Sequence, residues 1–410
     1  MLHAHSVAGS LFDALGYPPD HMDFAYENGC DALALTDHGN ANGLSHQVLH
    51  AKKMKEQGKT FKPIFGCEAY FIPSIAEWRD EYERALEDKK RAKTLGSELS
   101  GATVEDENSS KKVQDVLRRR RHLILLAQNQ TGLQNIFKLI SESYKSENFY
   151  RYPRMDYALL AKYSEGVIAA SACLGGVYAG NFWENREEGD EAVLNAMRET
   201  TRKMVSIFGD RWYGELQWNN VPEQHKLNQF IIKMHEEFGI GLISTADSHY
   251  PNPDAWKDRE LYKRLGWLGK AAPSYESTEL PIDVDEIGYE LYPKNGDQMW
   301  ESYKKYSAEC GVEYDDDLVL QSIKHTHEIA HQRIEDFLPD NTVRLPDFVV
   351  PAGYTATQAL VNMSIEGLRV KGFHNDKEYT ERLRHELTVI DDRGFSKYFL
   401  TMKAIADRAN

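Results

Sequence analysis

The chain begins with a group of potential metal ligands. His3 and His5 are separated by one residue, and Asp13 follows eight residues after His5. Residues two apart in a β-strand point to the same face, so both imidazoles would lie on one side of the strand. Two imidazoles and a carboxylate are ligands for zinc and other transition metals. The alternative is a loosely ordered or non-native terminus, because chain ends are often poorly fixed.

Further potential ligands stand where short apolar runs end. The runs 32–36, 62–66, 166–171 and 240–246 have the length and content of strands. The residues that follow them are Asp37, His38, Cys67, Glu68, Cys173, Asp247 and His249. In α/β barrels the functional residues lie at the carboxyl ends of the strands, where the loops converge. We therefore predict that these residues join the two amino-terminal histidines in a multinuclear metal site.

Each of these groups also has a structural interpretation when it is taken alone. Asp37 to Gly39 has the composition of a turn. Isolated cysteines such as Cys67 and Cys173 are most often buried as small apolar residues. Asp247 is of a residue type that caps helices. The coincidence of several such groups at strand ends is what favours the metal site.

Strand-like and helical patterns alternate between residues 20 and 250. Two more strand-like runs occupy 122–127 and 213–217, and the first of them begins, rather than ends, with a histidine. Residues 132–146 and 223–239 have helical spacing, and the second stretch ends on Gly239, a residue type that ends helices. This alternation predicts an α/β fold with parallel strands, either a barrel or a doubly wound sheet.

Two stretches interrupt this alternation. Residues 77–121 are highly charged and poor in apolar residues, and we expect an exposed helix followed by a flexible loop over 96–112. We interpret the basic run from Arg118 to Arg121 as a solvated surface rather than a DNA contact. Residues 271–297 are rich in proline and acidic residues, so we expect them to connect two regions.

The remaining sequence has helical patterns over 316–334, 355–372 and 378–410. The last pattern reaches the final residue without a stop signal, so we interpret the chain as interrupted at that point. His327 and His331 lie four residues apart in the first pattern. They lack the glutamate of a His-Glu-x-x-His motif, and we interpret them as surface or core residues rather than metal ligands.

The composition limits the classes of function. The formal net charge of −15 argues against broad, non-specific binding of nucleic acid, although bound metal ions would add positive charge that this count omits. The sequence has no apolar run of membrane-spanning length and no signal-peptide pattern at its start, so we expect no membrane association. The cysteines are too scattered for a disulfide framework and are typical of a cytoplasmic protein; they are Cys30, Cys67, Cys173 and Cys310.

Taken in order, the motifs resemble those of the PHP (polymerase and histidinol phosphatase) domain of bacterial replicative DNA polymerase III alpha subunits. The matching stretches are LHAHS with its following aspartate, ALTDHGN, PIFGCEAY, RHLILLAQN, GVIAASACLGG and STADSHY. The resemblance continues to the end of the chain, where YTERLRHELTVIDDRGFSKYFLTMKAIADRA is similar to the start of that family's polymerase region.

The resemblance implies both a fold and a set of ligands. The family fold is a distorted seven-stranded (β/α) barrel, which we expect over residues 1–270 with a charged insertion at about 77–121. A connector and a mainly helical beginning of the polymerase palm region are expected over 271–410, ending before the catalytic aspartates. The nine metal ligands of the family correspond to His3, His5, Asp13, His38, Glu68, His122, Cys173, Asp247 and His249. Every one of these positions holds a residue that can bind metal, which favours a working site.

The expected ligands indicate a chemistry. Five imidazoles, three carboxylates and one thiolate suit zinc, manganese or iron better than magnesium, and nine ligands could hold three ions. Clustered divalent ions are suited to phosphoester hydrolysis. In the family this activity corresponds to 3′→5′ exonuclease proofreading, so we expect a metal-dependent phosphodiesterase that acts on the 3′ end of a primer–template.

The resemblance does not extend to polymerisation by this chain alone. The Gly-rich loop and the aspartate cluster of the family's polymerase site should follow residues 395–410, so we expect a partner chain to carry the polymerase palm, within a set of replisome subunits. Two other functions stay open. The metals could stabilise a structural or assembly module without nuclease activity, or the site could belong to a small-molecule phosphatase, against which the polymerase-like tail argues.

Overall fold

The structure is a computed structural model that describes residues 1–98, 104–267, 289–340, 342 and 348–409. The chain divides into two compact units, Met1–Pro339 and Asp340–Asn410. The expected domain boundary at residues 270 and 271 lies outside the described residues. Most of the expected connector lies there too, since residues 268–288 are not described.

Seven extended segments, called staves below, form the barrel of the first unit. Six are strands: β1 (Ala32–Leu35), β2 (Lys62–Phe71), β3 (Arg121–Ala127), β6 (Val167–Ala170), β7 (Trp212–Gln217) and β8 (Gly241–Thr245). The seventh is the amino-terminal segment, residues 1–5. Its backbone bonds to β1 on one side, with Thr36 N 2.8 Å from Ala4 O, and to the residue after β8 on the other, with His5 N 2.7 Å from Ser248 O. The predicted distorted seven-stranded barrel is therefore confirmed.

The expectation of uniformly parallel strands is wrong for β3. This strand runs antiparallel to both of its neighbours, β2 and β6, whereas β1–β2, β6–β7 and β7–β8 are parallel pairs. A reversed strand presents its amino end where the parallel strands present their carboxyl ends. His122, which begins the apolar run of β3, thus lies at the same end of the barrel as the residues that follow β1 and β8.

Alternate residues of the staves point into the barrel and out towards the helices, as the period of two requires. The interior core includes Ile64, Ile124, Ile168 and Ile243. The outer core packs the other face of the same strands against helices and includes Phe65, Leu125, Ala169 and Leu242. Steps of two residues, forward from Ile64 and Ile243 and backward from Ile124, lead to Glu68, Asp247 and His122 in turn, so these side chains also point into the barrel.

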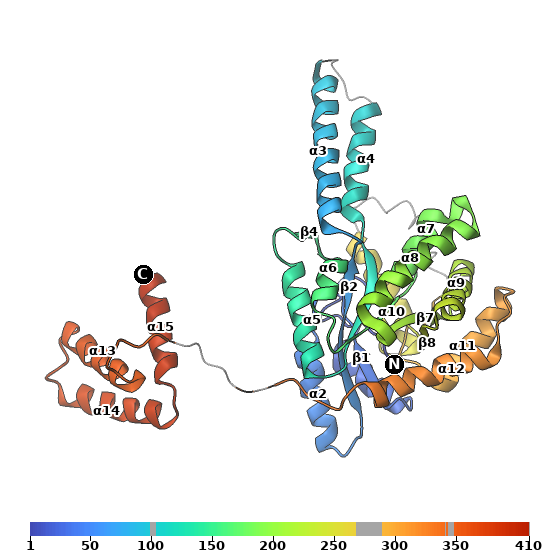
Figure 1. The fold of residues 1–410 in the computed structure, drawn as a ribbon. Helices are drawn as coiled ribbons and strands as arrows, with labels where there is room; N and C mark the ends of the chain where they lie inside the picture. The colour runs from blue at the N-terminus through green and yellow to red at the C-terminus, as the bar shows by residue number, and fades with distance from the viewer. Residues whose placement is uncertain (99–103, 268–288, 341, 343–347, 410) are drawn as a thin grey trace. The chain divides into compact units, whose positions relative to one another are not determined.

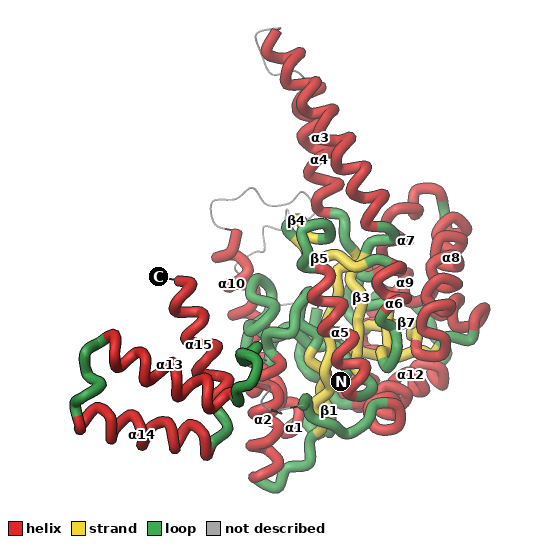
Figure 2. Tube along the Cα trace, turned by 60° about the vertical axis from the view of Figure 1, so that its left-hand side comes forward, coloured by secondary structure: helices red, strands yellow, loops and turns green. Residues whose placement is uncertain are grey.

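Helices cover the outside of the strands (Figure 2). In chain order around the barrel they are α1 (Pro18–Glu27), α2 (Leu44–Glu56), α5 (Gln130–Ser143), α6 (Tyr157–Lys162), α7 (Val177–Asn185), α8 (Asp190–Phe208) and α9 (Pro222–Phe238). Helix α10 (Trp256–Trp267) instead lies at the mouth of the barrel, where Arg259 bonds to the backbone of Asp13. The predicted helices at 132–146 and 223–239 correspond to α5 and α9. Gly239 ends α9 in the left-handed conformation, with φ of 66°, which a residue without Cβ adopts at low cost. A short hairpin of β4 (Phe149–Tyr150) and β5 (Tyr152–Met155) extends the sheet beside β2.

The charged insertion is a helical hairpin. Helices α3 (Ile75–Glu98) and α4 (Val104–Arg118) run side by side and project from the barrel (Figure 1). The expected flexible loop over 96–112 is therefore wrong for 96–98, which belong to α3, and for 104–112, which belong to α4; residues 99–103 lie outside the described part of the chain. The apolar residues that hold the pair together are spaced too widely to stand out among the charges, and they include Trp78, Ala85, Val113 and Val116.

The basic run after α4 is only partly a solvated surface. Arg118 is exposed as expected. Arg119 pairs with Glu81, and Arg120 lies over the ring of Tyr152 at 4.0 Å from its centroid.

The segment after the undescribed residues packs on the barrel. It contains α11 (Gly296–Glu309), α12 (Asp316–Glu328) and a π-helical turn, Ile329–Arg333. Helix α12 contacts β8, where Ser244 N bonds to Thr326 Oγ1 at 3.1 Å. Ile329, Ala330 and Ile334 are buried in the interior core, so this turn closes the end of the barrel opposite His122 and Asp247.

The second unit is helical, as predicted. It comprises α13 (Ala356–Val370), α14 (Lys377–Asp392) and α15 (Ser396–Ala409) around a small core that includes Ala359, Leu360 and Leu400. The helical pattern over 378–410 is split where Gly394 takes a φ of 70°. Across the described residues, no helix combines the length and the apolar content needed to cross a bilayer.

Candidate metal centre

The barrel brings the predicted ligands to one end of its interior. A pocket of about 170 Å³ opens there, and Asp13, His38, His122, Cys173, Asp247 and His249 line it. His3, His5 and Glu68 lie fully buried beneath these residues. All nine residues are thus placed at the same mouth, although their assignment as ligands stays a prediction.

Four side chains form the deepest cluster: His3, His5, Glu68 and Asp247. His3 Nε2 is 2.8 Å from Glu68 Oε2 and 2.9 Å from Asp247 Oδ1. His5 Nε2 is 3.1 Å from the same Asp247 oxygen. Ligand atoms around one ion at about 2.1 Å lie about 3–3.5 Å apart, so these atoms would need to separate only slightly to share a cation.

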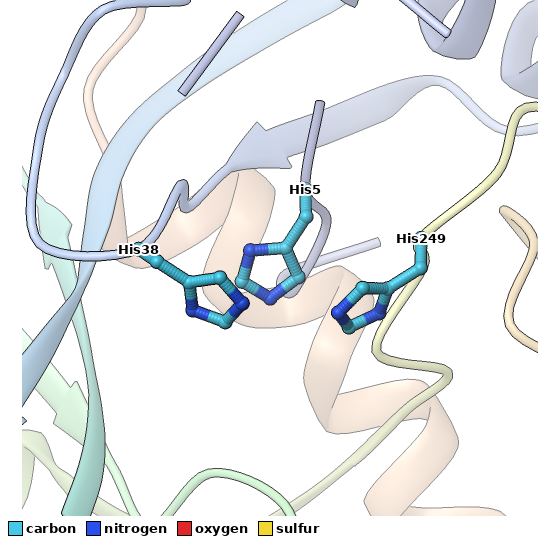
Figure 3. Close-up of side chains that lie close together, drawn as sticks. All are labelled: His5, His38 and His249. Atoms are coloured by element: carbon cyan, nitrogen blue, oxygen red, sulfur yellow. The ribbon is translucent and has the colours of Figure 1, made fainter. Parts of the chain in front are cut away.

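Two further clusters share members with the first. One contains His38, Glu68 and His122, in which His38 Nδ1 and His122 Nδ1 lie 2.8 and 2.6 Å from Glu68 Oε1. The other contains His5, His38 and His249, whose rings gather around one space (Figure 3). The two oxygens of Glu68 therefore face different clusters, as expected of a carboxylate that bridges two metal ions.

Asp13 and Cys173 lie at the margins of these clusters. Asp13 Oδ2 is 2.9 Å from His38 Nε2 and 3.8 Å from His249 Nε2. Cys173 Sγ is 3.7 Å from His122 Nδ1 and accepts a hydrogen bond from Gly175 N. Both side chains face the centre and can reach an ion held by their neighbours.

Local hydrogen bonds fix the loop that carries Asp13. Buried Asp37 accepts bonds from Ser6 N at 2.7 Å and Ser10 Oγ at 2.9 Å, which ties the loop after the first stave to the end of β1. On the other side, Asp247 adopts a left-handed backbone with φ of 49°. Aspartate is among the few residues that tolerate this conformation, which turns the chain so that Asp247 and His249 both face inward.

The carboxylates of the centre are held in their ionised form. Burial alone would raise the pKa of Glu68, but positive charge on His122 and His38 outweighs it and holds the pKa well below its usual range. The same balance holds for Asp247, where the charge on His3 and hydrogen bonds from His3 and His5 outweigh burial and lower the pKa. Ionised carboxylates are the form that binds metal.

The imidazoles and the thiol differ in proton affinity. Burial disfavours protonation of His3, but Asp247 and Glu215 outweigh it and raise the pKa well above the ordinary value. Burial lowers the pKa of His249 to about 4, which keeps that ring neutral. Burial and the carboxylates Asp247 and Glu68 raise the pKa of the Cys173 thiol. Metal binding must therefore displace protons from His3 and Cys173.

Three buried atoms of the centre face other predicted ligands without making a well-formed hydrogen bond to them. His38 Nδ1, Glu68 Oε1 and Asp247 Oδ1 are buried and lack a hydrogen bond of acceptable geometry. Buried polar atoms without partners are costly, whereas metal coordination satisfies them. The residues present thus fit a group of divalent ions.

Glu215 on β7 is a functional residue that sequence reasoning missed. Its Oε1 lies 2.6 Å from His3 Nδ1, on the side of the ring away from the cluster, and accepts a hydrogen bond from Gln217 Nε2 at 3.0 Å. A carboxylate in this position orients the imidazole and raises its basicity towards metal. The only signal in the sequence was an ionisable residue within the apolar stretch WYGELQ. The structure shows that every residue of this strand is buried.

Glu215→Gln is expected to weaken metal binding by about 10–100-fold, the usual effect of removing a partner of a ligating histidine. Competition with a chromogenic chelator measures the affinity for Zn²⁺. Glu184→Gln, which removes an exposed carboxylate paired with Arg121, is the control and should leave the affinity unchanged. Equal affinities in the two variants would contradict a positioning role for Glu215.

Arg259 on α10 was also missed. Its side chain is only 8% exposed, lines the pocket above the centre, and donates from Nε to Asp13 O at 2.6 Å. A guanidinium in this position offers further donors to an anion bound over the metal ligands. No motif in the sequence marked Arg259 as a site residue. Helix α10 follows the last strand, and only the folded structure shows that Arg259 lies at the mouth of the barrel.

The comparisons with known proteins agree with this architecture. The model of the family described as PHP domain matches residues 1–219. DNA polymerase III subunit alpha of Aquifex aeolicus is 33% identical over 98% of this chain and 30% of its own length. The same subunit of Borreliella burgdorferi is 30% identical over 97% of this chain and 29% of its own length. The chain thus spans about a third of the curated relatives that it matches.

A solved structure of an amidohydrolase from Chromobacterium violaceum aligns with 63% of this chain and 95% of its own, at 15% identity and a TM-score of 0.31. That score is too low to support an argument about fold or function. The assignment to a family rests instead on the PHP match. The matched residues make up more than half of the chain and include seven of the nine predicted ligands, all but Asp247 and His249. The chain belongs to the PHP domain family.

Proposed function

We propose that the centre is a multinuclear metal site that hydrolyses phosphodiesters at the 3′ end of DNA, as the proofreading part of a replicative DNA polymerase. The observation that carries this proposal is the sharing of ligands: Glu68, His5 and His38 each belong to two of the three clusters. Ligands shared in this way would hold more than one divalent ion, and clustered ions would supply the chemistry of phosphoester hydrolysis. Three ions, of zinc, manganese or iron, are the number and type that we propose.

The ions, when bound, supply a metal hydroxide at neutral pH and positive charge for the attacked phosphate and the leaving oxygen. The residues of the chain set the conditions for this chemistry. Glu68 holds two clusters together through its two oxygens, and His3 is oriented by Glu215. Asp13 and His249 stand at the open side, where a terminal phosphodiester enters the pocket.

Arg259 is proposed to bind the non-bridging oxygens of that phosphodiester. Arg259→Met is expected to lower kcat/KM for DNA ends by about 10–100-fold, consistent with the loss of one or two charge-assisted hydrogen bonds of about 1.5–3 kcal/mol each. Arg259→Lys should recover part of the loss. Because Arg259 contacts the pocket and not the clustered ligand atoms, the bound metal content should stay the same in both variants, and a loss of metal would contradict this assignment.

The relatives support DNA as the substrate class. They are subunits of a DNA polymerase, and the similarity runs through the second unit, beyond the PHP match. We propose that DNA and other replisome subunits are the partners, and that polymerisation needs a palm carried elsewhere. Bound divalent ions would add positive charge beside Arg259 that the formal net charge of −15 does not include.

Hydrolysis assays distinguish this proposal from the two alternatives. The metal-loaded chain should release nucleotides from single-stranded and 3′-mismatched DNA and act poorly on small phosphomonoesters. Hydrolysis of phosphomonoesters without action on DNA would favour a small-molecule phosphatase. Tight metal binding without either activity would favour a structural module.

A further inference from the structure

We propose that Asp31, His327 and His331 form a second divalent-cation site, at the end of the barrel opposite the candidate metal centre. The proposal does not depend on the proposed function. It commits to an ion of the imidazole-preferring class, with Zn²⁺ as the representative.

The fold brings together three ligands that are far apart in the sequence. Asp31 directly precedes β1, at the end of that strand remote from His38. His327 lies in the last turn of α12 and His331 in the π-helical turn that follows. Histidines separated by three residues lie on one helical face, and this spacing recurs in zinc sites. The interpretation of the two histidines as surface or core residues did not include Asp31, because no motif in the sequence connects it with them.

The distances match those imposed by a bound ion. His331 Nε2 and His327 Nδ1 lie 3.1 and 3.5 Å from the same oxygen, Asp31 Oδ2. The two imidazole centroids are 4.4 Å apart. A tetrahedral ion with ligand distances of about 2.1 Å separates neighbouring ligand atoms by about 3.4 Å. The three side chains therefore need little movement to coordinate one ion.

The backbone that carries these ligands is already fixed. Asp31 O accepts a bond from Lys62 N at 2.8 Å, which holds the start of β1 against β2. The π-helical turn is anchored by its buried residues Ile329 and Ala330, and Gln128 Nε2 donates to Arg333 O at 3.1 Å. A site built on fixed elements loses little entropy when it binds a ligand.

The exposure of Asp31, His327 and His331 indicates a surface site whose ion would also bind water. All three ligands are accessible to solvent, so water can complete the coordination of an ion held by three protein atoms. Such an ion would link the residue before β1 to the segment that closes the barrel at the end opposite the candidate metal centre. It would therefore act as a cross-link between β1 and α12, without any part in hydrolysis.

The test is a titration of the metal-free, full-length chain with Zn²⁺ alone. Bound equivalents are measured by equilibrium dialysis and elemental analysis in the wild type, His327→Gln and His331→Gln. Each variant is expected to bind one equivalent fewer than the wild type, and its melting temperature should rise less on addition of Zn²⁺. The residues are on the surface, so the melting temperatures without metal should agree.

His50→Gln is the matched control. His50 Nε2 pairs with Asp23 Oδ1 at 2.9 Å, so the variant removes an imidazole from a similar pair that has no second histidine. It should bind as many equivalents as the wild type. Repeating the titration in an Asp247→Asn background separates this site from the candidate metal centre, because the loss caused by His331→Gln should persist there. Equal stoichiometry in the wild type and His331→Gln, or an equal loss in His50→Gln, would overturn the proposal.

Discussion

Glu68→Gln is expected to abolish phosphodiester hydrolysis by this chain almost completely. Glu68 is fully buried and its two oxygens face two clusters, so the neutral amide removes a shared ligand and a negative charge at once. Removing a residue that is hydrogen-bonded to a metal ligand lowers metal affinity or activity by about 10–100-fold. Removing a ligand shared by two clusters should lower them by more than that. Metal analysis of the purified variant should show fewer bound ions than in the wild type.

The control for this variant is Asp23→Asn, which removes a carboxylate beside a histidine away from the pocket. It should retain full activity and metal content. A Glu68→Gln protein that stays folded and keeps wild-type hydrolysis would show that the shared carboxylate is not part of a working centre.

Removal of the metals is expected to lower the melting temperature of the first unit by about 10 °C. An ion present at about 1,000 times its dissociation constant stabilises the folded state by about 4 kcal/mol. In domains of about 150–250 residues each kcal/mol corresponds to about 2–4 °C, and the low end of that range applies to each ion here because the first unit, Met1–Pro339, is larger. Differential scanning calorimetry with and without a chelator measures the change, and restored Mn²⁺ or Zn²⁺ should reverse it. A chelator-independent melting temperature would contradict metal binding by the centre.

The stabilisation by metal should grow as the pH rises above about 6.5, the ordinary pKa of histidine. His3 and His38 have raised pKa values, because the neighbouring carboxylates outweigh burial. In the metal-free protein their protonation stabilises the folded state at lower pH, and this contribution is lost as the pH rises through the folded pKa. Metal binding needs both rings neutral, so the same rise in pH strengthens it. A metal-induced shift that shrinks as the pH rises would contradict this assignment.

The sequence predicted most of the centre because strand periodicity is local. Glu68 lies within β2, which continues to Phe71, whereas His38 and Asp247 follow the ends of β1 and β8; the residue types at these positions were visible without a structure. His122 was different. Its position at the start of a run made sense only once β3 proved to be antiparallel, and strand direction depends on connections that no short motif specifies.

The missed residues share a physical cause. Glu215, Arg259 and Asp31 each act through a partner that is distant in the sequence, so their own neighbours in the chain carry no signal of their roles. The helix α4 was missed for another reason. Its apolar contacts to α3 are few among many charges, and tertiary packing overrides a composition that by itself favours a loop.

The central claim is tested most directly by nucleotide release from a 3′-mismatched primer annealed to a template. The Mn²⁺- or Zn²⁺-loaded wild-type chain should shorten the primer from its 3′ end, and the His5→Ala/Asp247→Ala variant should not. Circular dichroism should confirm that the variant is folded. Equal release by the two proteins, or no release by a fully metal-loaded wild type, would contradict the account.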